Sequence, residues 1–289
     1  MTKNQAGRRF DRFLLAHLNR APQSVVYKLL RKKRIKLNGK RAQGSEITAA
    51  GDTVTLYLSP ETLQSFIEER TPPSKRPPLD IIYEDEDILL ANKPAGLLSH
   101  SDSANQDTLQ DRLAYYANGA AICNRLDRNT SGIVICGKNT AALQSLNKQL
   151  AERKIDKTYL AIVHGRPKKT HADLHAYLYR SENEKRSHIT DRPREDAAEI
   201  HTEYEALEFY TDFTLLRVKI HTGRHHQIRA HLAAIGHPIA GDTKYGGKPT
   251  RHRRGQLLHC QAVGVTDRLT FTAPLPEDFE NFIDERKSK

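Results

Sequence analysis

From Leu79 onward, short stretches of alternating apolar and polar residues recur between turn signals, and this pattern constrains the fold more than any other feature. Alternation with a period of two is typical of strands that bury one face. Strands are predicted at 80–83, 88–92, 157–163, 172–179, 200–209, 213–221, 256–265 and 268–272. Helical spacing is found at about 139–153 and in a segment ending at Gly236, and residues 181–198 are expected to form a polar, mobile insertion. Many strands with few helices indicate an α+β domain with a mixed, mainly antiparallel sheet.

One stretch of this region combines a carboxylate with two arginines. The apolar run from Ile133 to Cys136 predicts a buried strand, and directly before it stands Arg125-Leu126-Asp127-Arg128-Asn129-Thr130-Ser131-Gly132. Asp127 is therefore expected on a loop or strand edge, where catalytic groups are often presented. Flanking cations favour its ionised form. Spacing alone leaves two interpretations open: a catalytic carboxylate, or a structural aspartate that bridges two surface arginines.

The excess positive charge of the chain belongs to its first part. Residues 1–58 hold 13 Lys and Arg against 3 Asp and Glu, whereas the remaining residues hold 33 against 32. Apolar spacing predicts two short helices within 8–31 and strands at 35–37 and 54–58, with an Asn38-Gly39 turn between them. A local basic excess is the footprint expected for a polyanion partner. The candidate phosphate-binding residues are Arg31, Lys32, Lys33, Arg34, Lys36, Lys40 and Arg41.

Composition also limits the organisation and location of the protein. The proline-rich residues 59–78 predict a linker between a small α/β domain at 8–58 and a larger domain at 79–289. No apolar run approaches the roughly 18 residues of a transmembrane helix, and residues 1–9 lack the apolar core of a secretory signal. Three cysteines without metal-ligand spacing are typical of reduced thiols. We therefore expect a cytoplasmic protein.

Several stretches of the larger domain stand in a characteristic order. They are Leu90 to Gly96, Asn124 to Gly132, Lys157-Thr158-Tyr159, and Thr222 to Arg229, continued from Gly236 to Asp242. In this order and spacing they resemble the RluA family of RNA pseudouridine synthases. The pattern from Arg12 to Lys40 resembles an S4-type RNA-binding domain. One departure is Asn124, because many members of the family have His at that position.

The resemblance implies a function and a set of residue roles. The protein would isomerise uridine to pseudouridine in structured RNA, with large-subunit (23S) ribosomal RNA as the expected substrate. Asp127 would be the catalytic carboxylate, either bonding to ribose C1′ or acting as the base that gives a glycal. Arg229 would pair with Asp127, Tyr159 would stack on the base, and Arg125 would fill the space of the flipped nucleotide. The resemblance implies no cofactor, and we expect a monomer.

Three alternatives compete with this interpretation. The first is a catalytically inactive RNA-binding or ribosome-assembly factor on the same fold, which the intact set of Asp127, Tyr159 and Arg229 disfavours. The second is a metal site built on histidines, for which no carboxylate or cysteine has a matching spacing; the histidines concerned are His225, His226 and His231. The third pairs Asp127 with Asp242 as the acid and base of a glycosidase. The basic N-terminal region favours an RNA substrate instead.

Overall fold

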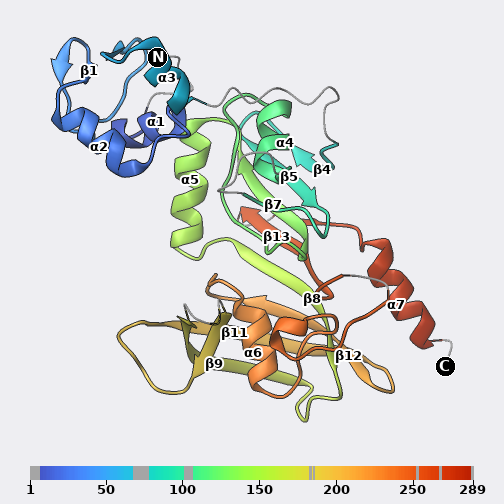
Figure 1. Cartoon of the computed structure of the whole chain (residues 1–289). Helices are drawn as coiled ribbons and strands as arrows, with labels where there is room; N and C mark the ends of the chain where they lie inside the picture. The colour runs from blue at the N-terminus through green and yellow to red at the C-terminus, as the bar shows by residue number, and fades with distance from the viewer. Residues whose placement is uncertain are drawn as a thin grey trace. The chain divides into compact units, whose positions relative to one another are not determined.

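The computed structural model describes residues 7–67, 78–100, 107–181, 184, 186–251, 254–266 and 269–287 (Figure 1). Its contacts divide the chain into two compact units. The first comprises residues 7–67 together with Asn139–Ala141, and the second comprises the described residues of Pro78–Lys138 and Ala142–Lys289. Within the described ranges no helix is both long enough and apolar enough to cross a membrane.

The first unit combines helices with a small antiparallel sheet. Helices α1 (Phe10–His17) and α2 (Gln23–Arg31) precede strands β1 (Ile35–Leu37), β2 (Lys40–Arg41) and β3 (Val54–Leu56), which pair in the order β2-β1-β3. Asn38 and Gly39 both have positive φ, 49° and 72°, as a two-residue hairpin turn requires. Helix α3 (Pro60–Phe66) occupies the start of the expected linker, and its Leu63 and Phe66 pack on the same apolar cluster as α1 and α2. The rest of that linker, 68–77, lies outside the described residues.

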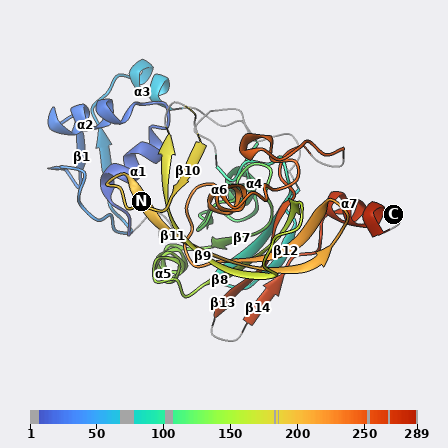
Figure 2. The same cartoon turned by 90° about the horizontal axis from the view of Figure 1, so that it is seen from below.

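The described part of the second unit holds eleven strands in one sheet. Nine of them follow the order β10-β9-β11-β12-β8-β13-β7-β5-β4, while β14 pairs with β13 and β6 with β7. Only the β13–β7 pair is parallel among these strands, which confirms the predicted mixed, mainly antiparallel sheet. The β13–β14 hairpin extends away from the other strands (Figure 2). The strands are β4 (Ile81–Glu84), β5 (Ile88–Lys93), β6 (Ala121–Ile122), β7 (Ser131–Gly137), β8 (Asp156–His164), β9 (His171–Ser181), β10 (Arg186–Thr190), β11 (Ala197–Phe209), β12 (Phe213–Ile220), β13 (Leu258–Thr266) and β14 (Leu269–Thr272).

Helices flank this sheet and position the functional side chains. They are α4 (Leu109–Tyr116), α5 (Thr140–Ala151), α6 (Gln227–Ala234), the 3-10 turn η2 (Thr243–Tyr245) and α7 (Glu277–Lys287). Helix α6 packs against β10 and β11, and Figure 1 shows it in front of the sheet beside the label of β11. Strand β7 is buried over its whole length, as its apolar run predicts. The core therefore anchors the loop that carries Asp127, directly before β7.

The segment 181–198, expected from the sequence to be a mobile insertion, is partly ordered as a strand. Arg186–Thr190 forms strand β10, antiparallel to Tyr177–Ser181 of β9, so the prediction of a mobile segment is wrong there. Ser187 is buried, and its polar groups are satisfied there: its backbone N–H donates to the Tyr245 hydroxyl at 2.9 Å and its Oγ donates to the His225 carbonyl at 3.0 Å. The polar composition of this segment predicted exposure, because the hydrogen-bond partners that allow Ser187 to be buried are distant in the sequence.

Candidate active site

A cavity of about 1240 Å³ lies in the second unit, lined by the 123–129 loop, the start of β8, the 221–226 loop and α6. Its lining is strongly basic. The cations are Arg125, Arg128, Arg153, Lys157, Arg180, Arg224, Arg229 and Lys244, against the carboxylates Asp127 and Asp156. A concave site lined by one sign of charge concentrates ligands of the opposite sign, so this cavity suits a polyanion.

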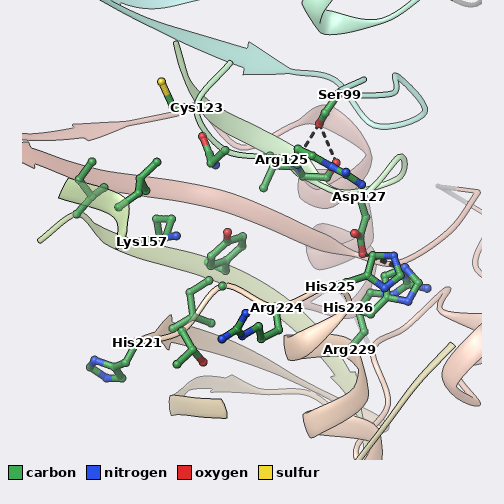
Figure 3. Close-up of a pocket in the computed structure, with 18 of the residues that line it drawn as sticks. Ser99, Cys123, Arg125, Asp127, Lys157, His221, Arg224, His225, His226 and Arg229 are labelled. Atoms are coloured by element: carbon green, nitrogen blue, oxygen red, sulfur yellow. Dashed lines mark hydrogen bonds and ion pairs between the residues drawn. The ribbon is translucent and has the colours of Figure 1, made fainter. Parts of the chain in front are cut away.

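The loop that carries Asp127 is held by hydrogen bonds to the segment after β5. Ser99 Oγ donates to the Leu126 carbonyl at 2.8 Å and accepts from the Leu126 N–H at 3.1 Å (Figure 3). The fully buried ammonium of Lys93 donates to the carbonyls of Leu97 and Arg128 at 2.7 and 3.0 Å. These bonds restrain the backbone on both sides of Asp127 and so fix the place of its side chain.

Asn124, at the position where many members of the family have His, lines the cavity and also bonds to the neighbouring strand. Asn124 Oδ1 accepts a hydrogen bond from the Ile135 N–H at 2.8 Å, so the side chain ties the loop to β7. Its Nδ2 is buried and has no partner among the described residues. Asn124 therefore has a structural contact of its own in this chain.

The Thr-Ser-Gly turn after Asp127 is locked onto β13. Thr130 Oγ1 accepts from Gln256 Nε2 at 3.0 Å, and Ser131 Oγ lies 3.0 Å from His259 Nδ1. Gly132 has φ +108°, and a Cβ there would lie 2.2 Å from the Cys260 carbonyl oxygen. The glycine is needed because the parallel strand β13 passes directly against its Cα.

Asp127 and Arg229 meet at the wall of the cavity although 102 positions separate them. Arg229 Nη1 donates to Asp127 Oδ2 at 2.9 Å, and the Asp127 side chain is 23% exposed while that of Arg229 is 8% exposed. Figure 3 shows Asp127 pointing toward Arg229 and the adjacent histidines. Burial opposes the charge of Arg229, but hydrogen bonds to two carboxylates raise its pKa above the ordinary value. The guanidinium therefore stays charged beside Asp127.

Asp242 holds the other edge of the same guanidinium. It accepts from Arg229 Nε at 2.6 Å and from Nη2 at 2.8 Å, and its side chain is 1% exposed. Both of its oxygens are engaged and it is absent from the cavity lining. The glycosidase interpretation is therefore wrong, because Asp242 cannot reach a substrate. The contact of Asp242 with Arg229 was not predicted from the sequence, although Asp242 ends the stretch Gly236 to Asp242 that belongs to the family pattern.

The two oxygens of Asp127 have different surroundings. Oδ2 is 2.9 Å from Arg229 Nη1 and 3.6 Å from His226 Nε2. No hydrogen bond to Oδ1 is found among the described residues. Since both neighbouring groups approach Oδ2, Oδ1 is the oxygen that these two groups leave available for contact with a ligand.

Tyr159 and Arg125 line the same cavity from different elements. Tyr159 lies on β8 and is 6% exposed; burial raises the pKa of its phenol well above the usual value, so the phenol is neutral. Arg125 is exposed on the 123–129 loop, beside Ser99 in Figure 3. No role was predicted from the sequence for Lys157, whose side chain also lines the cavity and whose pKa is lowered by burial.

The loop before α6 is fixed by Gln227. Its Oε1 accepts from Thr222 Oγ1 and from the Arg224 N–H at 2.8 and 3.1 Å. Its Nε2 donates to the His201 carbonyl and to Thr202 Oγ1, both at 3.0 Å. The glutamine thereby ties the loop to β11 and sets the start of α6, two residues before Arg229.

The candidate RNA-binding cations lie in the first unit. Lys36 is half-buried, with its ammonium 5.1 Å from the centre of the Tyr57 ring. The others are exposed at the end of α2 and on β2: Arg31, Lys32, Lys33, Arg34, Lys40 and Arg41. Exposed ammonium and guanidinium groups are available for phosphate contacts.

The histidines considered as metal ligands are only partly brought together. The ligand atoms of Asp127, His225 and His226 lie within 4.8 Å of one another, so folding supplies the carboxylate that spacing did not. Arg229 already contacts that carboxylate, and its charge disfavours a cation there. His231 is buried on α6 outside this group.

Comparison with protein families and relatives identifies the type of domain. The family model described as RNA pseudouridylate synthase matches residues 87–234. The RNA pseudouridine synthase YlyB of Bacillus subtilis is 32% identical over 299 residues, covering 98% of this chain and 95% of that protein. Ribosomal large subunit pseudouridine synthase C of Escherichia coli is 34% identical over 255 residues, covering 86% and 79%. The protein of the same name from Vibrio vulnificus is 32% identical over 300 residues, covering 97% and 93%.

Two solved human structures share the fold. The chain titled RNA Pseudouridylate Synthase Domain Containing 1 has a TM-score of 0.59 at 26% identity, covering 76% of this chain and 98% of that chain. The chain titled RNA Pseudouridylate Synthase Domain Containing 4 has a TM-score of 0.60 at 22% identity, covering 72% and 93%, and shows the fold alone.

Proposed function

This chain belongs to the RluA family of RNA pseudouridine synthases and is an isomerase of RNA uridines, and we propose that Asp127 performs the reaction on large-subunit ribosomal RNA. The observation that carries the proposal is the Asp127–Arg229 ion pair, 2.9 Å long, at the wall of a basic cavity. Relatives named ribosomal large subunit pseudouridine synthase C support the choice of RNA.

Asp127 acts on the ribose of a uridine that has been flipped out of the RNA. Breaking the N1–C1′ bond makes C1′ electron-poor, and a carboxylate stabilises that carbon either by bonding to it or by removing a neighbouring proton to give a glycal. Oδ1 is the reacting oxygen, because Arg229 and His226 both approach Oδ2. The freed base turns and rejoins C1′ through C5.

The residues around Asp127 orient this carboxylate and the flipped uridine. Arg229 aims Asp127, since its charged Nη1 donates a hydrogen bond of 2.9 Å to Oδ2 and so restrains the carboxylate. Tyr159 stacks on the uracil as a neutral phenol. Arg125, exposed at the cavity mouth, fills the space that the flipped base leaves in the RNA.

The reaction needs no co-reactant. One C–N bond breaks and one C–C bond forms, C5 loses a proton and N1 gains one, so the product has the formula of the substrate. We further propose that the protein acts on ribosomal RNA as a monomer in the cytoplasm.

The first unit serves as an S4-like RNA-binding module in this proposal. The proposed module is the part of that unit at residues 8–58; residues 59–78 join it to the proposed catalytic domain at 79–289, and the basic excess of the chain lies within residues 1–58. Phosphate contacts by the seven cations identified above would position the RNA without reading its sequence.

A tritium-release assay tests the catalytic assignment. Unmodified large-subunit RNA transcribed with uridine tritiated at C5 loses that label when C5 becomes the glycosidic carbon. The wild-type protein is expected to release tritium and Asp127→Asn to release none, while its RNA affinity stays within about threefold because one rim charge is a small part of a phosphate-dominated interface. Asp156→Asn, in the same cavity but away from Arg229, is the matched control.

Two results would contradict different parts of the proposal. Tritium release by Asp127→Asn at the wild-type rate would remove Asp127 from the mechanism. Release from small-subunit or transfer RNA, but not from large-subunit RNA, would overturn the substrate while leaving the role of Asp127 intact.

A further inference from the structure

Two hydrogen bonds and one longer contact connect strand β10 to Asp127. The residues involved are Ser187 on β10, Tyr245 at the end of η2 and His226 directly before α6. The Ser187 N–H donates to the Tyr245 hydroxyl at 2.9 Å, and that hydroxyl lies 3.0 Å from His226 Nδ1. His226 Nε2 then lies 3.6 Å from Asp127 Oδ2. Each link joins residues that are distant in sequence.

The direction of the hydrogen bonds follows from the donors available. Burial lowers the pKa of His226 to about 3, because the attraction of Asp127 only partly offsets it, so the imidazole is neutral and carries one proton. The Tyr245 oxygen already accepts from Ser187, and its O–H is free to donate to His226 Nδ1. That bond leaves the proton of His226 on Nε2. The opposite tautomer would aim a lone pair at the carboxylate.

The backbone of His226 supports a specific orientation. The residue is held in the left-handed region, with φ 58° and ψ 19°, immediately before the first residue of α6. A non-glycine residue in this region costs of order 1 kcal/mol and persists where the surroundings hold it. The Tyr245 hydroxyl and the stacked ring of His225, 3.7 Å away between centroids, supply those surroundings.

We propose that His226, with its tautomer set by Tyr245, is a positioning residue that donates from Nε2 to Asp127 Oδ2 and so presents Oδ1 to the ribose. This inference rests on the proposed function of Asp127. The contact of 3.6 Å shortens to a hydrogen bond when a substrate closes the site, as catalytic contacts commonly do. Arg229 and His226 then restrain one oxygen from two directions.

Two substitutions of His226 separate positioning from packing. In His226→Gln the side-chain amide nitrogen takes the place of Nε2 and can still donate to Asp127. In His226→Asn the shorter amide lies near the place of Nδ1, so its oxygen can accept from the Tyr245 hydroxyl but its nitrogen cannot reach Asp127. We expect His226→Asn to lower kcat about tenfold with KM nearly unchanged, and His226→Gln to recover most of that loss.

Tyr245→Phe provides an independent variant should the His226 substitutions fail to fold. It removes the hydroxyl that selects the tautomer, and kcat is expected to fall about fivefold at an unchanged KM, the scale of one neutral hydrogen bond. Thermal unfolding and RNA affinity, measured on the full-length protein, show that each variant is folded and binds substrate.

The outcomes distinguish this inference from the catalytic role of Asp127. Equal kcat values for His226→Asn and His226→Gln, or a wild-type kcat for Tyr245→Phe, would overturn the positioning role of His226. If Asp127→Asn is inactive in the same assay, the proposed function survives that result. An active Asp127→Asn would remove both.

Discussion

Arg229 donates two hydrogen bonds to Asp242, 2.6 Å long from Nε and 2.8 Å long from Nη2, and this leaves Nη1 for Asp127. One guanidinium thus joins a fully buried carboxylate to a cavity-facing one. The pairing with Asp242 sets the plane of the guanidinium, since a bidentate contact fixes both position and orientation. The geometry at Asp127 therefore depends on a residue outside the cavity.

Replacement of Asp242 should impair both activity and stability. Asp242→Ala removes two of the three hydrogen bonds that the buried guanidinium donates to carboxylates. Breaking a buried ion pair costs about 3–5 kcal/mol of unfolding free energy. Misplacement of Arg229 should also lower kcat/KM by about 100-fold. Denaturant unfolding and tritium release measure the two effects. Glu280→Gln, an exposed acid on α7, is the control and should change neither.

The close contact of β7 with β13 predicts a steric effect at Gly132. A Cβ there would lie 2.2 Å from the Cys260 oxygen at a φ of +108°, so Gly132→Ala should reduce the unfolding free energy by about 3 kcal/mol or more. Gly236 has a similar φ of +86°, but a Cβ added there would meet no other atom within 4 Å. Gly236→Ala should cost only about 1 kcal/mol. Equal losses in urea titrations would contradict the steric explanation.

Buried neutral histidines predict how stability varies with pH. Burial lowers the pKa of His231 to about 4, and its Nδ1 has no partner among the described residues. Between this pKa and the ordinary value of about 6.5, the unfolded state binds one more proton than the native state. Stability is therefore present above pH 6.5 and lost as the pH falls, by at most about 1.4 kcal/mol per pH unit for this residue.

His231→Leu checks that sign. The unfolding free energy of the variant should depend less steeply on pH between about 4 and 6.5, by about one proton per molecule. Leu269→Ala, which replaces an exposed residue without a titratable group, should leave the wild-type slope. An unchanged slope in His231→Leu would show that this histidine is protonated in the folded protein.

The basic cluster at the end of α2 predicts a salt effect. Simultaneous replacement of Arg31, Lys32, Lys33 and Arg34 by Ala should weaken RNA binding and reduce the slope of log K against log salt by about 3, if each contacts a phosphate. Filter binding from about 50 to 200 mM salt measures the slope. Lys287→Ala, whose ammonium lies 3.5 Å from Glu208, is the control. A constant slope would mean that the first unit is not the main phosphate anchor.

Local patterns predicted most of the second unit. Period-two alternation predicted the positions of eight strands, because successive side chains of a strand point to opposite faces of the sheet. These strands are β4, β5, β8, β9, β11, β12, β13 and β14. Helices α4 and α7 were missed, since α7 is rich in charge and α4 follows residues without a clear periodic pattern. Strand β10 was missed because its buried polar groups bond to residues that are remote in sequence.

The sequence by itself determined the family, the fold class and the candidates Asp127, Tyr159, Arg229 and Arg125, since all of these follow from local pattern and motif order. Only the tertiary structure decided that Asp242 accepts two hydrogen bonds from Arg229 and that His226 lies beside Asp127. The same holds for the parallel contact that requires Gly132. The physical reason is that these contacts join residues brought together by the order of strands in the sheet, and pairing order is not encoded in any short stretch of the chain.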